Sequence, residues 1–182
     1  MRYLIVCGGK TDKEFGLNEI KTDGIDAIIA ADSGMDFLYE NGVTPDIIVG
    51  DFDSATTKAL EFFERKGQTE IHRLNPIKDD TDTEYAIRLA IREGARSIVL
   101  LGATGSRIDH VLGNISLLGI GLESGTDISI IDTNNRIRMA DRPVTIEKSA
   151  QYGRFVSLIA VTDDNEVSLR GFKYPVTDYS YA

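Results

Sequence analysis

Two carboxylates one residue apart, Asp51 and Asp53, are the side chains of this sequence best suited to chemistry. They follow the apolar run Ile47–Val49 and a glycine, Gly50. A short run of β-branched residues that ends at a glycine is typical of a buried strand followed by a sharp turn. Carboxylate oxygens are the ligands that hard divalent cations such as Mg²⁺ prefer. The spacing therefore predicts a magnesium site at the end of a strand.

Two further acids, Asp32 and Asp82, lie after apolar runs elsewhere in the chain. In α/β proteins the carboxyl ends of parallel strands meet at one edge of the sheet, where ligands bind. We therefore expect Asp32 and Asp82 to join the metal site, because clustered carboxylates repel one another unless a cation lies between them. For each acid alone, a competing interpretation is that it only stabilises the N-terminus of a helix.

A glycine-rich turn, Gly102–Ser106, separates a predicted strand from a predicted helix. Its backbone N–H groups can approach a phosphate or a nucleobase, although its spacing matches neither a dinucleotide fingerprint nor a Walker A loop. Arg107 can grip a phosphate with two nitrogens or form a surface ion pair. Lys78 can contact a phosphate or balance the neighbouring acids. His110 and Asn114 lie one turn apart on the same face of the predicted helix.

The elements that must position these residues alternate between strands and helices. The predicted strands are 3–7, 26–31, 47–49, 71–74 and 97–101, and the predicted helices are about 33–41, 56–66, 81–94 and 108–122. Ser33 with Asp36, and Thr81 with Glu84, have the spacing of helix-capping boxes. The alternation predicts an α/β domain over residues 1–132, with a mostly parallel, Rossmann-like sheet covered by helices.

The pattern changes after Asp132. Turn-forming residues at 133–135 are followed by short alternating runs at 137–139, 144–146, 155–161 and 167–169, with no helical pattern between them. Such runs are typical of antiparallel strands with one exposed face. We therefore predict a small antiparallel β-sandwich domain over residues 133–182.

The composition narrows the class of protein. The chain has 182 residues, of which 42% are apolar, and this is enough for a folded core. Its net charge of −9 argues against nucleic acid as a partner. No apolar stretch approaches the ~20 residues that a membrane span requires. The single cysteine, Cys7, lies within an apolar run, so we expect a buried thiol, no disulfide and a cytoplasmic location.

Four motifs in order resemble those of the bacterial thiamine pyrophosphokinase family. They are ADSG at 31–34, GDFDS at 50–54, KDDTD at 78–82 and GATGSRIDH at 102–110. The resemblance implies an N-terminal domain that holds ATP and Mg²⁺, a C-terminal domain that holds thiamine, and a homodimer with the acceptor site between subunits. It also implies the reaction, in which the pyrophosphoryl group of ATP passes to the hydroxyl of thiamine and AMP leaves.

The resemblance also implies roles for individual residues. Asp51, Asp53 and Asp82 are expected to be catalytic and, together with Asp32, to hold the metal ion. Asp82 is in addition our candidate for the carboxylate that takes the proton of the hydroxyl. The residues expected to bind ATP are Asp32, Ser33, Gly34, Lys78, Thr104, Gly105, Ser106, Arg107, Asp109, His110 and Asn114. The β-domain of the family normally continues beyond Ala182, which leaves the thiamine contacts open.

Three other functions fit parts of the pattern. The same scaffold suits a pyrophosphokinase for a pterin alcohol. A nucleotide-binding regulator would keep the ATP and Mg²⁺ site without catalysis. The stretch Val49–Ser54 alone also resembles the signature of a phosphatase with an aspartate nucleophile. That signature usually follows the first strand, whereas here it follows the third predicted strand, which argues against a phosphatase.

Overall fold

The computed structural model describes residues 1–52, 57–75, 80–105 and 107–180. Its chain divides into two compact units, Met1–Tyr152 and Gly153–Ala182. Over the described residues, no helix combines the length and the apolar character that are needed to cross a bilayer. The domain boundary expected at residue 132 stays a prediction.

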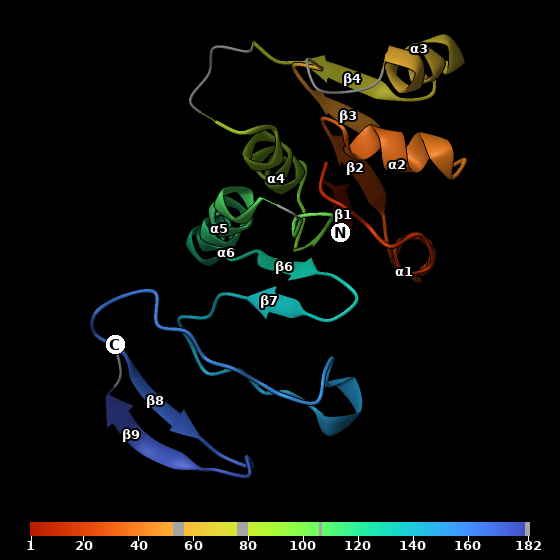
Figure 1. The fold of residues 1–182 in the computed structure, drawn as a ribbon. Coiled ribbons are helices and arrows are strands. Elements are labelled where there is room, and N and C mark those ends of the chain that lie inside the picture. The colour runs from red at the N-terminus through yellow and green to blue at the C-terminus, as the bar shows by residue number, and fades with distance from the viewer. Residues whose placement is uncertain (53–56, 76–79, 106, 181–182) are drawn as a thin grey trace. The chain divides into compact units, whose positions relative to one another are not determined.

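The first unit is built on a seven-stranded sheet with the order β4-β3-β2-β1-β5-β6-β7. Strands β1 to β6 are parallel, and β7 pairs antiparallel with β6 at the edge (Figure 1). This confirms the mostly parallel sheet. The strands are β1 Arg2–Val6, β2 Ala27–Ala31, β3 Ile47–Gly50, β4 Glu70–Arg73, β5 Ser97–Leu101, β6 Asp127–Ile131 and β7 Arg136–Arg138.

Helices cover both faces of this sheet (Figure 1). One face carries α1 Lys13–Ile20, α2 Gly34–Glu40 and α3 Thr57–Lys66, and the other carries α4 Asp82–Arg92, α5 Ile108–Ser116 and α6 Leu118–Ser124. Side chains of a strand alternate between the faces, so Leu4 and Val6 join one core while Tyr3 and Ile5 join the other. Burial on both faces explains why these strands are continuous apolar runs.

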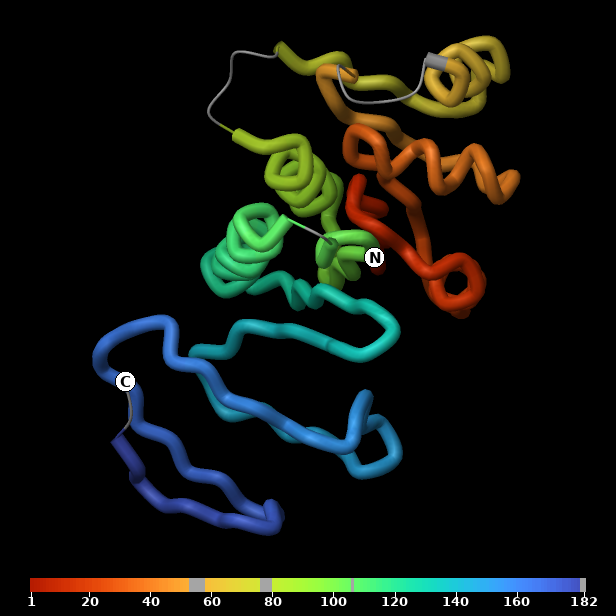
Figure 2. The backbone as a smooth tube through the Cα atoms, viewed as in Figure 1, coloured from red at the N-terminus to blue at the C-terminus, as the bar shows by residue number. Residues whose placement is uncertain are grey.

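The path of the chain creates a topological switch point in the sheet. The chain runs outward from β1 to β4 and then returns to place β5 on the other side of β1 (Figure 2). The connections after β1 and β5 therefore leave toward opposite faces of the sheet. In such sheets the crevice at this switch point, at the carboxyl ends of the strands, is the usual ligand site.

Three local predictions need correction. The helix expected over 108–122 is two helices, because α5 ends at Ser116 and α6 begins at Leu118. Ser33 stands at the N-cap of α2 but makes no capping hydrogen bond, because its backbone is helical rather than extended. The run 137–139 was expected in the smaller β-domain, but Ile137 and Arg138 belong to β7, Arg136–Arg138, of the large sheet.

The second unit contains an antiparallel hairpin of β8 Glu166–Leu169 and β9 Val176–Ser180. It confirms a small antiparallel β structure at the C-terminus.

The runs 144–146 and 155–161 were expected to be strands, but they carry no strand in the structure. Their apolar side chains are exposed, with Phe155 82% and Ile159 84% accessible. A strand forms where its backbone groups find a pairing partner, and the alternating pattern alone does not supply one.

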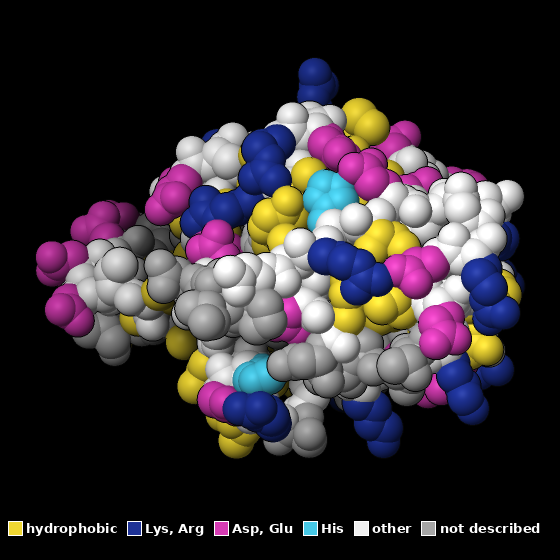
Figure 3. Space-filling model, turned by 90° about the horizontal axis from the view of Figure 1, so that it is seen from above, with side chains coloured by type: hydrophobic (Ala, Val, Ile, Leu, Met, Phe, Trp, Pro, Cys, Tyr) yellow, Lys and Arg dark blue, Asp and Glu magenta, His cyan; other side chains and the backbone are white. Residues whose placement is uncertain are grey.

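Charges of both signs lie on the face drawn in Figure 3. Figure 3 shows acidic and basic side chains interspersed over the visible face.

Candidate active site at the carboxyl edge of the sheet

Asp32 directly follows β2 and has a left-handed backbone, with φ of 48°. Its N–H donates to the carbonyl of Val49 at 2.8 Å, and its own carbonyl accepts from the N–H of Met35 at 3.2 Å. These bonds tie the turn to β3 on one side and to α2 on the other. The carboxylate atom Oδ1 is buried. Asp32 is therefore held in an uncommon conformation that directs the chain from β2 into α2.

Asp51 directly follows β3, and close packing favours the glycine before it. A Cβ atom on Gly50 would lie 3.1 Å from the Cα of Asp32 and 3.1 Å from the ring of Phe52. The carbonyl of Gly50 accepts from the N–H of Leu74 at 2.9 Å, which continues the pairing with β4 past the end of the strand. The absence of a side chain at Gly50 thus lets the turns after β2 and β3 approach each other.

Asp82 is the first residue of α4. The side chain of Thr81 caps this helix, with Oγ1 accepting from the N–H of Glu84 at 3.1 Å. This confirms the capping role predicted for Thr81. The carboxylate of Glu84 instead accepts from Arg88, at 2.9 and 2.7 Å. The cap fixes where α4 begins and therefore where the Asp82 carboxylate lies.

The three acids meet at one point of the sheet edge. One carboxylate oxygen each from Asp32, Asp51 and Asp82 lies within 4.8 Å of the other two. Each comes from a different connection of the chain, and each residue is partly buried. An all-oxygen donor set at this spacing suits a hard cation such as Mg²⁺. Asp53, the other expected ligand, lies outside the described residues.

The turns after β1 and β5 interlock at the switch point. The N–H of Gly9 donates to the carbonyl of Gly102 at 2.9 Å. A Cβ atom on Gly9 would lie 2.3 Å from that carbonyl oxygen, so only glycine fits. The amide of Asn114 donates to the carbonyl of Ala103 at 2.8 Å and holds the turn from the side of α5. Asn114, expected to bind ATP, thus supports the glycine-rich turn in this structure.

Asp132 was not among the predicted site residues, although it follows β6 and organises this edge. Its Oδ2 accepts from the hydroxyl of Thr104 at 3.0 Å. Its Oδ1 accepts from the N–H groups of Asn134 and Asn135, at 2.8 and 2.7 Å. Burial raises the pKa of Asp132, but these hydrogen bonds outweigh it and leave the pKa below its usual value. The sequence signal was an Asp at a strand end followed by two Asn residues.

The residues at the start of α5 pair with one another. The guanidinium of Arg107 donates to both carboxylate oxygens of Asp109, at 3.2 and 2.5 Å. This contact holds the pKa of Asp109 below its usual value. His110 lies 4.0 Å from the same carboxylate, and all three side chains are exposed. Of the two roles open for Arg107, the structure displays the surface ion pair.

Ser33 and Gly34 lie where the turn after β1 meets α2. A Cβ atom on Gly8 would lie 2.1 Å from the hydroxyl of Ser33, and one on Gly34 would lie 2.0 Å from the carbonyl of Val6. The structure therefore brings both residues to the same edge as Asp32. Gly105 also lies at this edge, where a Cβ atom on it would lie 3.6 Å from the Cα of Gly9. Lys78 and Ser106, also expected to bind ATP, lie outside the described residues.

Cys7 is buried directly after β1, as predicted. The hydroxyl of Thr83 donates to its sulfur at 3.7 Å. Burial raises the pKa of the Cys7 thiol to about 11 despite this contact. The thiol therefore stays protonated at neutral pH and packs as a small apolar side chain.

Both parts of the chain match described protein families. Residues 21–130 match the family described as thiamin pyrophosphokinase, catalytic domain, and residues 143–182 match thiamin pyrophosphokinase, vitamin B1 binding domain. A thiamine pyrophosphokinase of Bacillus subtilis is 36% identical over 152 residues, which are 82% of this chain and 70% of that protein.

Solved structures with these names have the same fold. The crystal structure of thiamine pyrophosphokinase from Bacillus subtilis superimposes with a TM-score of 0.85 at 32% identity, over 99% of this chain and 84% of that chain. The crystal structure of thiamin pyrophosphokinase from Geobacillus thermodenitrificans gives a TM-score of 0.79 at 27% identity, over 100% and 83% of the two chains.

Proposed function

The chain belongs to the thiamin pyrophosphokinase family, and we propose that it transfers the pyrophosphoryl group of ATP to the hydroxyl of thiamine, giving thiamine diphosphate and AMP. The observation that carries the proposal is the convergence of Asp32, Asp51 and Asp82 at the sheet edge. Phosphoryl transfer depends mainly on positioning and on neutralising phosphate charge. Because carboxylates and phosphates are both negatively charged, a carboxylate cluster can bind a polyphosphate only through a cation that lies between them.

We propose Mg²⁺ as that cation, held by Asp32, Asp51 and Asp82, with Asp53 as a further ligand. The donor set supports this choice, because all three described candidates are carboxylates with oxygens within 4.8 Å of one another. When bound, the ion supplies positive charge against the phosphates. Asp82 remains our candidate for the group that takes the proton of the thiamine hydroxyl.

The turn after β5 is our candidate for the loop that binds the phosphates of the nucleotide. Thr104 is held by Asp132, and Ala103 is held by Asn114, so the backbone of this turn is fixed before a ligand arrives. Preorganised N–H groups stabilise phosphate charge without reorganisation. Arg107 would exchange Asp109 for a phosphate, which is feasible because an exposed ion pair contributes little to stability.

We propose a homodimer with the acceptor site between subunits. Exposed apolar side chains support this proposal within each unit. Ile108 and Leu112, one turn apart on α5, are 74% and 60% accessible. In the second unit Phe155, Ile159 and Tyr174 are exposed as well. Apolar surface of this kind is typical of a protein interface. Light scattering on the purified chain should give twice the mass of 20.0 kDa.

We also propose that the protein works in the cytoplasm. Its single cysteine is a buried thiol, which suits a reducing compartment. Fractionation of cells that express the full chain tests this location.

The decisive experiment measures AMP released from ATP and Mg²⁺ with thiamine, with a pterin alcohol and with no acceptor. Thiamine-dependent AMP in equal amount to thiamine diphosphate is the expected result. AMP formed only with the pterin alcohol would instead assign the other acceptor. Binding of ATP and Mg²⁺ in calorimetry without AMP release in any of the three mixtures would indicate a regulator.

A further inference from the structure

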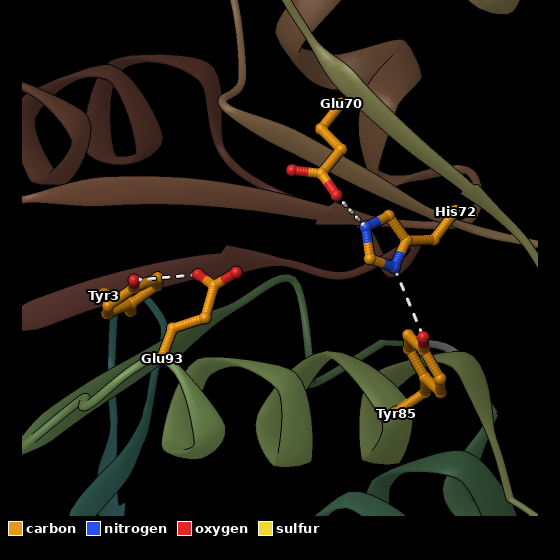
Figure 4. A network of polar contacts seen from close by, with 5 residues as sticks. All are labelled: Tyr3, Glu70, His72, Tyr85 and Glu93. Atoms are coloured by element: carbon orange, nitrogen blue, oxygen red, sulfur yellow. Dashed lines mark hydrogen bonds and ion pairs between the residues drawn. The ribbon is translucent and has the colours of Figure 1, made fainter.

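A chain of polar contacts joins α4 to the edge strand β4 (Figure 4). Atom Nδ1 of His72 lies 3.2 Å from the hydroxyl of Tyr85, and Nε2 lies 2.6 Å from Oε1 of Glu70. A carboxylate can only accept, so Nε2 of His72 carries the proton that it donates to Glu70. In the neutral ring Nδ1 is then the acceptor, and the Tyr85 hydroxyl donates to it. For the neutral imidazole, the order of donors therefore runs from Tyr85 through His72 to Glu70.

The middle of this chain is partly buried. The His72 side chain is only 21% exposed. The ring of Tyr85 packs against the core between α4 and the sheet, and the guanidinium of Arg92 lies 5.6 Å from its centroid. The rings of His72 and Tyr85 also meet edge to face, with centroids 6.1 Å apart. These contacts hold the ring of Tyr85 with its hydroxyl directed at His72.

The contact joins the elements that carry two members of the carboxylate cluster. Tyr85 is three residues after Asp82, so the two lie one turn apart on the same side of α4. His72 is in register with Val49, two residues before Asp51, in the pairing of β4 with β3. The hydrogen bond therefore ties the helical turn that carries Asp82 to the strand pair that carries Asp51.

We propose that Tyr85 and His72 are positioning residues, which hold Asp82 at the correct distance from Asp32 and Asp51 and so set the affinity of this site for its cation. The inference rests on the metal site proposed above. Removal of a residue that orients a metal ligand commonly lowers the metal affinity by roughly 10-fold or more. Such groups touch neither the metal ion nor the substrate.

The other end of α4 supplies a matched control. The hydroxyl of Tyr3 on β1 donates to Oε2 of Glu93 at 2.9 Å, and Glu93 is the C-cap of α4 (Figure 4). Tyr3→Phe removes the same kind of bond between the sheet and α4, about three helical turns from Asp82. If the loss of such a bond acted only by loosening α4 on the sheet, Tyr3→Phe and Tyr85→Phe should weaken cation binding equally. A positioning role predicts that only Tyr85→Phe weakens it.

The test is calorimetric titration of the purified full chain with Mn²⁺ as the probe, well below the melting temperature of each variant. Tyr85→Phe and His72→Leu should each weaken Mn²⁺ binding by about 10-fold, and the double variant should lose no more than either alone. His72→Asn places an amide oxygen near the position of Nδ1 and should restore part of the affinity. Tyr3→Phe should bind Mn²⁺ as the unchanged chain does.

Two results would overturn the inference, and a third concerns the metal site itself. If Tyr85→Phe binds Mn²⁺ normally while Asp82→Asn does not, the positioning role is wrong. If Tyr3→Phe weakens binding as much as Tyr85→Phe, the effect is general loosening of α4. If Asp82→Asn binds Mn²⁺ as tightly as the unchanged chain, the proposed metal site fails, and the positioning role fails with it.

Discussion

The hydroxyl of Thr104 donates to Oδ2 of Asp132 at 3.0 Å and joins the turn after β5 to the turn after β6. The same carboxylate closes its own turn through Asn134 and Asn135. The carbonyl of Asp132 also accepts from the hydroxyl of Tyr152, over whose ring the guanidinium of Arg136 lies. One acid thus fixes the glycine-rich turn and the chain that leaves the large sheet.

We expect Asp132→Asn to raise the KM for ATP several-fold and to lower stability by about 1 kcal/mol. An amide offers a single acceptor oxygen, so it cannot receive all the donors that converge on the two carboxylate oxygens. Steady-state kinetics and urea unfolding measure the two effects. Asp127→Asn is the matched control, because Asp127 begins β6 and its side chain forms an exposed ion pair with Arg138. Equal effects of both substitutions would show that Asp132 has no special role.

Asp51→Asn should lower turnover by orders of magnitude and leave the fold intact. In EDTA the variant should melt no lower than the unchanged chain, because one of three clustered negative charges has been removed. Asp46→Ala should show the opposite pattern. Its carboxylate accepts from the N–H of Ile28 at 2.8 Å, just before β3 begins. The loss of this bond should lower the stability by about 1 kcal/mol and leave turnover unchanged. Near-normal AMP release by Asp51→Asn would refute its role in the metal site.

Thr81→Ala should remove the N-cap of α4 and cost about 1 kcal/mol. Because the freed turn carries Asp82, the affinity for Mn²⁺ should fall as well. Asp12→Ala removes the corresponding cap of α1, where the carboxylate accepts from the N–H of Phe15 at 2.9 Å. Its effect on stability should be similar, with no change in metal affinity. Calorimetry and thermal melting on both variants distinguish a local loss of order from a general one.

Stability should fall at alkaline pH through two buried groups. Burial raises the pKa of Tyr3 from 10.0 to about 12, and it raises the pKa of Cys7 from 9.0 to about 11. Since both groups keep their protons longer when folded, their stabilising effect is complete below pH 9 and is lost as pH rises to 12. Urea unfolding at increasing pH measures the slope. Tyr3→Phe should flatten the part between pH 10 and 12, and Cys7→Ala the part between pH 9 and 11.

The parallel sheet and the acidic edge could be predicted because their signals are local. A buried parallel strand is apolar on both faces, and the acids of the cluster stand near the starts of the turns and helices that follow. The cap at Thr81 was predictable for the same reason, since a Thr three residues before a Glu defines it within one turn.

Other features depended on contacts between distant segments. Asp132 reaches the turn after β5 only because β6 pairs with β5. The sequence of β6 alone does not indicate which strand it pairs with. The strand β7 was assigned to the wrong sheet, since a three-residue run carries no information about which edge it joins. The exposed runs 144–146 and 155–161 alternate as strands do, yet alternation does not provide a pairing partner.

The proposed metal site would also make the folded state sensitive to divalent cations. Asp32, Asp51 and Asp82 come from three separate connections, so no local segment of the unfolded chain can reproduce the arrangement. An ion that binds them therefore binds the folded chain far better than the unfolded one, and thermodynamic linkage converts its binding energy into folding energy. If Mg²⁺ binds there as we propose, the free magnesium concentration would determine how much of the chain is folded as well as how fast it turns over.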